Sequence, residues 1–155
     1  MPQNFSSDSD AALAALRAMV AIADSSVEHA TGQLTLTQFR ALRVTSDRTP
    51  VTMSRVADEL AMNPSTVTRA CDRLVSLGLM QKAQNPLNKR EILLAPTAKG
   101  RQVVDRVDEE RRRALGVVLD QLKPELRAAV VSALGLFADA AHAVGGLATA
   151  ALGKD

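Results

Sequence analysis

The chain has 155 residues, of which 46% are hydrophobic, with a formal net charge of +2 and one cysteine. This length suits one domain with a real core, and a single cysteine excludes an intramolecular disulfide framework and fits a reducing cytoplasm. The amino terminus is polar and acidic, unlike a signal peptide, and apolar runs stay below the ~18–20 residues of a membrane span. We therefore expect a cytoplasmic protein with no membrane partner.

Positive charge is concentrated in the middle of the chain. Residues 38–100 contain ten basic and five acidic side chains. Residues 1–37 contain one basic and four acidic side chains, and residues 101–155 contain eight of each. A basic segment between acidic and neutral flanks is the electrostatic footprint expected of a nucleic-acid-binding protein.

Two helices are predicted before the basic segment begins. Apolar residues recur at three- and four-residue steps from residue 9 to about residue 30, which indicates an amphipathic helix. The second helix begins with a capping box formed by Thr35 and Gln38, and Leu34 and Phe39 fit the hydrophobic staple around it.

Residues 52–78 predict a helix-turn-helix. Thr52 can cap a first short helix, Asn63 and Pro64 suit the N-cap and first turn of a second helix, and Gly78 suits its left-handed terminator. The second helix is apolar on one side and carries hydroxyls and two arginines on the other. Such a small, polar, cationic face is what a recognition helix offers to the major groove.

The polar side of that second helix supplies the first set of predicted DNA contacts. Its two arginines are four residues apart, so they project from one face and repel mildly unless something anionic lies there. A solvated helix face would show the same residue types, and the basic hairpin that follows favours DNA. The expected contacts to bases or phosphates are Ser65, Thr66, Thr68, Arg69 and Arg73.

A β-hairpin is predicted directly after the helix-turn-helix. Two strand-like runs, residues 79–84 and 91–95, flank the turn-forming sequence NPLNKR. This is the position of the wing in a winged helix, whose tip can follow the phosphate backbone or place an arginine in the minor groove. The expected contacts from the wing are Asn88, Lys89 and Arg90.

A long helix from residue 98 to about residue 122 follows the hairpin. Its middle, DEERRR, predicts i,i+4 ion pairs between Asp108 and Arg112 and between Glu109 and Arg113. We interpret this run as a solvated, ion-paired helix face rather than as a DNA contact.

The last predicted helix begins at Pro124 and ends at a pair of glycines, residues 145–146. Together with the first helix it carries more apolar surface than one small winged helix can cover. These helices could pack on their own lobe, but intertwining them with a second copy would bury them in a twofold dimer, which is the arrangement that we expect.

Four segments resemble the MarR family of regulators, in both order and spacing. They are LTLTQFRAL (34–42), VADELAMNPSTVTRACDRLVSLGLM (56–80), NPLNKR (85–90) and TAKGR (97–101). The resemblance implies a mainly α fold with a small β-hairpin wing. It places a winged helix-turn-helix DNA-binding domain at residues 34–102, dimerisation helices at 9–33 and 103–147, and mobile tails at 1–8 and 148–155.

The resemblance also implies a function. MarR-type proteins are homodimers that bind a palindromic double-stranded DNA operator, usually as repressors, and are usually released by a small-molecule effector. One departure concerns the wing, where the family usually has an aspartate two residues before the arginine and this chain has Asn88. A neutral amide should orient the Arg90 guanidinium less firmly than a carboxylate would.

Other classes of function have less support. The two histidines, His29 and His142, are not in any metal-ligand spacing, no glycine-rich phosphate loop is present, and we expect neither an enzyme nor a cofactor. Cys71 lies on an apolar helix stripe, so we expect a buried thiol rather than a redox sensor. The alternative that remains is a winged-helix module that binds an acidic protein partner.

Overall fold

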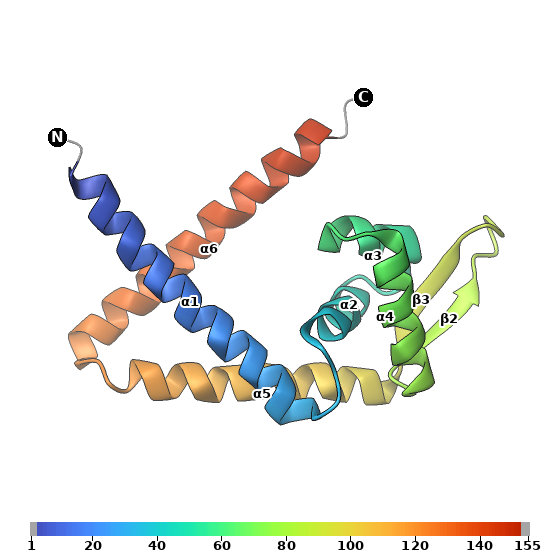
Figure 1. Ribbon diagram of the computed structural model, residues 1–155, viewed down its shortest axis with the longest axis horizontal. Helices are drawn as coiled ribbons and strands as arrows, with labels where there is room; N and C mark the ends of the chain where they lie inside the picture. Colours follow the sequence, from blue (N-terminus) through green and yellow to red (C-terminus); the bar gives the residue numbers. More distant parts are fainter. Residues whose placement is uncertain (1–2, 153–155) are drawn as a thin grey trace. The chain divides into compact units, whose positions relative to one another are not determined.

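The structure is a computed structural model that describes the backbone of residues 3–152 and the side chains of residues 7–145. It confirms the predicted fold class, mainly α with a small β-hairpin wing (Figure 1). The chain forms two compact units, Met1–Ala114 and Leu115–Asp155. The elements are, in order, α1 (Gln3–Thr31), α2 (Leu36–Asp47), β1 (Val51–Thr52), α3 (Met53–Leu60), α4 (Pro64–Ser76), β2 (Met80–Gln84), β3 (Ile92–Pro96), α5 (Ala98–Leu119) and α6 (Pro124–Leu152).

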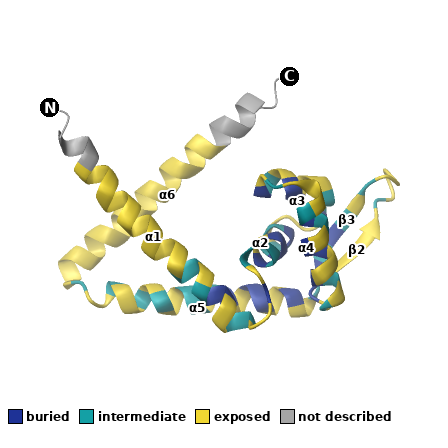
Figure 2. Cartoon of the chain, viewed as in Figure 1, coloured by how far each residue is buried: buried dark blue, intermediate teal, exposed yellow. Residues whose placement is uncertain are grey.

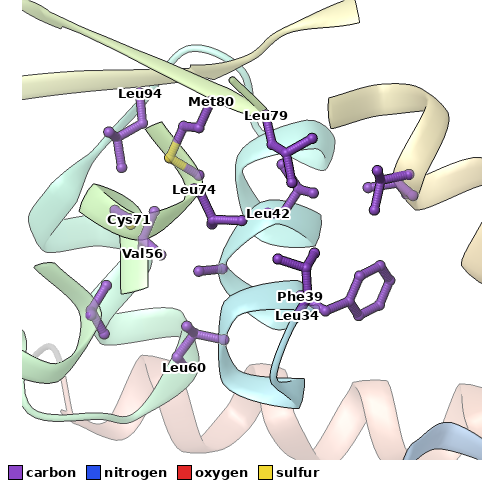
Figure 3. Packing of buried hydrophobic residues seen from close by; sticks show 14 of the residues in the cluster. Leu34, Phe39, Leu42, Val56, Leu60, Cys71, Leu74, Leu79, Met80 and Leu94 are labelled. Carbon is purple, nitrogen blue, oxygen red and sulfur yellow. The ribbon is translucent and has the colours of Figure 1, made fainter. Parts of the chain in front are cut away.

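The core of the first unit lies where α2, α3 and α4 pack against one another and against the sheet. Phe39 and Leu42 of α2, Leu74 of α4 and Leu94 of β3 are at most 1% exposed, and Figure 3 shows Leu74 and Leu94 on one side of α2 and the Phe39 ring on its other side. Burial of each such side chain contributes roughly 1.5–3 kcal/mol to folding. The dark residues of Figure 2 accordingly gather on these elements and on the first half of α5.

The sheet has three antiparallel strands in the order β1-β3-β2. In the predicted hairpin, Met80 is opposite Pro96 and Gln84 is opposite Ile92. The sequence did not predict β1, in which Val51 pairs with Leu94. Two residues are too few to show an alternating pattern, so this strand can be identified only from its pairing with β3 in the structure.

Capping fixes both ends of α4 as predicted. The Asn63 side chain accepts a hydrogen bond from the Ser65 N–H at 2.9 Å, with Pro64 in the first turn. At the other end Gly78 has φ +71°, and its N–H donates to the Val75 carbonyl at 2.9 Å. This left-handed terminator satisfies carbonyls of the last turn and holds the end of α4 in one geometry.

The caps of the two preceding helices are also confirmed. In α2, Thr35 and Gln38 form both hydrogen bonds of the capping box, at 3.2 and 3.0 Å. In α3, the Thr52 side chain accepts from the Arg55 N–H at 3.2 Å. Each such cap stabilises its helix by about 1 kcal/mol.

Some predicted boundaries differ from the structure. Helix α1 begins at Gln3 rather than at residue 9, and α5 ends at Leu119 rather than at residue 122. Of the tails expected to be mobile, residues 3–8 continue α1 and residues 148–152 continue α6. The remaining tail residues lie outside the described part of the chain.

Helix α6 corrects the expectation that no apolar run approaches the length of a membrane span. The segment Pro124–Gly145 has a mean hydropathy of 1.5 over an 18-residue window and could cross a membrane by length and composition alone. One such helix is weak support for a membrane protein, because helices at a subunit interface have the same composition.

Candidate nucleic-acid interface

The side of α4 that faces away from the core carries the predicted recognition residues. Ser65, Arg69 and Arg73 are exposed there, whereas Thr66 and Thr68 are half-buried at its edges. The opposite side of the same helix is buried through Val67, Ala70, Cys71 and Leu74. The predicted division of α4 into an apolar and a polar side is therefore confirmed.

The arginines of α4 and of the wing, residues 80–96, are not held by carboxylates. Among the described side chains, none of the ion pairs includes Arg69, Arg73, Lys89 or Arg90. The Arg69 Nε donates instead to the Ser65 carbonyl at 3.3 Å. These four positive charges are consequently available to an anionic partner.

Two of the α4 hydroxyls make hydrogen bonds within the first turns of the helix. The Ser65 hydroxyl lies 2.8 Å from the Asn63 side-chain oxygen, and the Thr68 hydroxyl donates to the Pro64 carbonyl at 2.9 Å. A DNA contact by either hydroxyl would therefore use its oxygen as an acceptor, or would require the hydroxyl to rotate.

Two shallow hollows flank the start of α4. The first, of about 300 Å³, is lined by Arg69 and Thr66 of α4 and by the first turn of α2. The second, of about 370 Å³, lies between the wing and the starts of α3 and α4, where Arg90, Ser54 and Pro64 line it together. Thus Arg90 of the wing and the first residue of α4 line the same hollow, although these residues are far apart in the sequence.

The wing tip is shaped by its asparagines, and Asn88 makes its contact with the backbone of Arg90. The Asn88 side-chain oxygen accepts from the backbone N–H of Arg90 at 3.2 Å and not from its guanidinium. Similarly, Asn85 accepts from the Leu87 N–H at 3.0 Å and donates to Glu91 at 2.9 Å. The two asparagines fix the backbone of the turn, which is a local role that asparagine performs as well as aspartate.

One basic residue of the wing forms an ion pair with an acidic residue of α4, which sequence reasoning missed. The Nζ of Lys82 on β2 lies 2.7 Å from the carboxylate of Asp72 on α4. The two residues are ten positions apart and belong to different elements, so no helical or strand period could indicate the pair. The contact connects the wing to α4 across the exposed surface.

The ion pairs predicted within α5 are also wrong in detail. Arg112 pairs with Glu109 at 3.4 Å and Arg113 with Glu110 at 2.7 Å, both at i,i+3 spacing. Asp108 instead lies 2.6 Å from Arg43 of α2. This hydrogen bond raises the pKa of Arg43, so the pair stays charged and links α5 to α2.

Arg111 differs from its two neighbours in the predicted solvated run. Its guanidinium lies over the Phe39 ring, 4.9 Å from the centroid, and its Nε donates to the Ser26 hydroxyl at 3.3 Å. Desolvation lowers the pKa of Arg111. The cation–π contact connects α5 with α2, and the hydrogen bond to Ser26 connects α5 with α1.

Cys71 is fully buried, as predicted. Desolvation raises the pKa of its thiol to about 11, and Asp72 adds to this effect. The reactive form of cysteine is the thiolate, so the thiol is unreactive at neutral pH. Among the described residues, no three histidine, cysteine, aspartate or glutamate side chains group as metal ligands would.

Comparisons with known proteins identify the family of this chain. The sequence model of the MarR family matches residues 34–92. The crystal structure of RV1404 from Mycobacterium tuberculosis is 36% identical, superimposes with a TM-score of 0.75, and is matched over 85% of this chain and 90% of that one. This chain belongs to the MarR family. Family members are DNA-binding transcriptional regulators, which confirms the predicted class of function and excludes an enzyme.

Two other relatives match a smaller part of the chain. The uncharacterised HTH-type transcriptional regulator YhjH of Bacillus subtilis (strain 168) is 28% identical over 78 residues, which are 50% of this chain and 45% of that relative. The match therefore spans less than half the length of that curated relative. The PcaV transcriptional regulator of Streptomyces coelicolor, solved with its natural ligand, is 26% identical over 70% of this chain and 77% of its own, with a TM-score of 0.52.

Proposed function

We propose that this MarR-family member is a homodimeric repressor that binds a palindromic double-stranded DNA operator and is released by a small-molecule effector. The observation that carries the proposal is that Arg69 and Arg73 of α4 and Arg90 of the wing are exposed, and that none of them pairs with a carboxylate within the described residues. An internal ion pair would have reduced the attraction of such residues to phosphate.

In the proposed complex each subunit places α4 in a major groove. The wing tip, with Asn88, Lys89 and Arg90, reaches the flanking backbone or the adjacent minor groove. Two lobes related by a twofold axis require half-sites about 10 bp apart, centre to centre. The proposed contacts to bases or phosphates from α4 are Ser65, Thr66, Thr68, Arg69 and Arg73.

The proposed dimer would cover apolar side chains that each unit exposes by itself. In α1, Leu16 is 56% exposed, and in α6, Leu136 and Phe137 are 69% and 72% exposed. Yellow residues fill the described part of α6 in Figure 2. We expect Phe137→Glu to convert the dimer into monomer in light-scattering chromatography. Leu87→Glu is the matched control, because Leu87 is 95% exposed on the wing and should not affect the oligomeric state.

The proposed release from DNA by an effector is supported by the similarity to PcaV, whose structure was solved with its natural ligand. Ligand binding in a regulator works only if the ligand has different affinities for the DNA-bound and the free conformation. A thermal-shift screen against aromatic acids, drugs and metal ions, followed by displacement of bound DNA, would test this part of the proposal.

Fluorescence anisotropy with the region upstream of the protein's own gene tests the proposal as a whole. We expect one dimer per operator, protection of two half-sites in a footprint, and an affinity that falls steeply with salt concentration through counterion release. Equal, weak binding to the upstream region and to unrelated duplexes would contradict an operator-binding repressor. Retention on an acidic protein partner without retention on DNA would favour the alternative function.

A further inference from the structure

The first turn of α5 holds the carboxyl end of α4. The Thr97 hydroxyl donates to the Gly78 carbonyl at 2.7 Å, and the Thr97 N–H donates to the Leu79 carbonyl at 3.0 Å. The Lys99 ammonium donates to the Leu77 carbonyl at 3.2 Å. Three successive carbonyls directly after α4, those of residues 77–79, are therefore bound by Thr97, which precedes α5, and by Lys99 of its first turn.

The same hydroxyl also begins α5. The Thr97 oxygen accepts from the Gly100 N–H at 3.0 Å, which is the geometry of a helix cap. A Cβ on Gly100 would lie 2.0 Å from the Leu79 carbonyl oxygen, so only glycine permits so close an approach of α5. One hydroxyl thus makes hydrogen bonds both to the residue that terminates α4 and to the first turn of α5.

Further along, α5 is attached to the rest of the DNA-binding unit at two more points. Asp108 pairs with Arg43 of α2, and Arg111 lies over Phe39 of the same helix. These contacts hold α5 against α2, whereas the contacts of Thr97 hold it against α4. Of these contacts, only those of Thr97 and Lys99 reach the residues that directly follow the helix with the proposed recognition residues.

We infer that Thr97 is a positioning residue for DNA recognition, which fixes the orientation of α4 relative to α5 and so the separation of the two recognition helices in the dimer. The inference rests on the proposed function, because it concerns how the same DNA surface is held. Interfaces and packed cores switch between discrete arrangements rather than deforming continuously, so loss of this link should allow α4 a second orientation relative to α5 while its buried side stays packed. Thr97 itself need not contact DNA.

The substitution Thr97→Val tests the inference, because it keeps the side-chain shape and removes the hydroxyl. Thr97→Ser should restore the wild-type behaviour. Thr31 offers a matched control at the end of α1, since its hydroxyl also makes two hydrogen bonds, donating to the Val27 carbonyl at 2.7 Å and accepting from the Leu34 N–H at 3.2 Å. Thr31→Val should cost similar stability without touching α4.

Two readouts separate positioning from simple stability. The first readout is the affinity of each variant for operator probes whose half-sites are one base pair closer together or further apart. It is measured at a temperature where all variants are folded. We expect Thr97→Val to lose roughly tenfold in affinity for the preferred spacing, a factor typical of coupling between sites, and to discriminate less between spacings. Hydrogen exchange of the full chain without DNA should show faster exchange at residues 77–79 in Thr97→Val only.

The outcomes distinguish this inference from the proposed function. Wild-type protein that binds no operator would contradict the proposed function and, with it, the role of Thr97 in recognition. Wild-type binding with the same spacing preference in Thr97→Val, or an equal loss in Thr31→Val, would overturn the inference alone. Unchanged hydrogen exchange at residues 77–79 in Thr97→Val would also overturn it, whatever the DNA result.

Discussion

The ammonium of Lys82 lies 2.7 Å from the carboxylate of Asp72, which connects the first strand of the wing to the exposed side of α4. Both side chains are about half exposed, at 45% and 50%, so the pair contributes at most about 1 kcal/mol to stability. Its larger effect is electrostatic, because Asp72 places a negative charge beside Lys82 on a surface that we propose to face DNA.

We expect Asp72→Asn to tighten DNA binding while leaving the unfolding free energy nearly unchanged. The substitution removes a negative charge and frees Lys82, so the dependence of affinity on salt should become steeper. Anisotropy titrations at several salt concentrations measure this effect. Asp105→Asn on α5 is the control, since it changes the net charge equally on another element. Equal effects of the two substitutions would contradict a local contribution of Asp72.

Gly100 gives a prediction about stability. Because a Cβ there would lie 2.0 Å from the Leu79 carbonyl oxygen, Gly100→Ala must move backbone, and we expect a loss of about 1–3 kcal/mol, as for other overpacked sites. Urea unfolding measures the change. A Cβ added at Gly116 of the same helix would meet none of the described atoms within 4 Å, so Gly116→Ala should be neutral or stabilising by up to about 1 kcal/mol.

Asn63 gives a prediction about the start of α4. Its side chain accepts from the Ser65 N–H at 2.9 Å, so Asn63→Ala should lower the unfolding free energy by about 1 kcal/mol. Asn63→Asp should retain the stability, because aspartate is an equally good N-cap residue. Thermal or urea unfolding measures both variants. A loss of the same size in Asn63→Asp would mean that the cap is not the cause.

Cys71 gives a prediction about pH. Burial raises the pKa of its thiol to about 11, against about 8.5 for an exposed cysteine. As the pH rises, the unfolded chain therefore loses the thiol proton before the folded chain does. The protonated Cys71 thiol contributes fully to the unfolding free energy below about pH 8.5, and this contribution is lost as the pH rises towards 11. At pH 8 we expect iodoacetamide to alkylate the native thiol at least roughly a hundredfold more slowly than the unfolded one.

Controls for this prediction use Cys71→Ala. The unfolding free energy of this variant should be lower than that of the wild type. Between about pH 8.5 and 11 it should also fall less with pH, because the variant has no thiol to lose a proton. Fast alkylation of the native protein would contradict a buried, inert thiol. So would a loss of DNA binding after mild peroxide treatment, if the Cys71→Ala variant keeps its DNA binding under the same treatment.

The features that the sequence predicted correctly are local ones. The capping box of Thr35 and Gln38, the cap at Asn63 and the left-handed Gly78 each depend on residues within a few positions of one another. Their side chains and backbones are forced together whatever the rest of the chain does, so residue type and spacing are sufficient to identify them.

The features that the sequence missed are formed between elements. Lys82 with Asp72, Arg43 with Asp108 and Arg111 with Phe39 all join residues on different helices or strands. Asp108 was predicted to pair with Arg112 at i,i+4, but the carboxylate is within reach of Arg43 only after α2 and α5 have packed. Single-sequence periodicity contains no information about such competing partners.

The most direct test of the central claim compares two charge-matched triple variants on the operator as salt concentration is changed. The first replaces Arg69, Arg73 and Arg90 by alanine, and the second replaces Arg106, Arg112 and Arg113 of α5. We expect the first to lower the affinity at least roughly a hundredfold and to reduce the slope of log affinity against log salt by about three, and the second to behave like wild type. Equal losses in both variants, or none in the first, would contradict a DNA surface built from α4 and the wing.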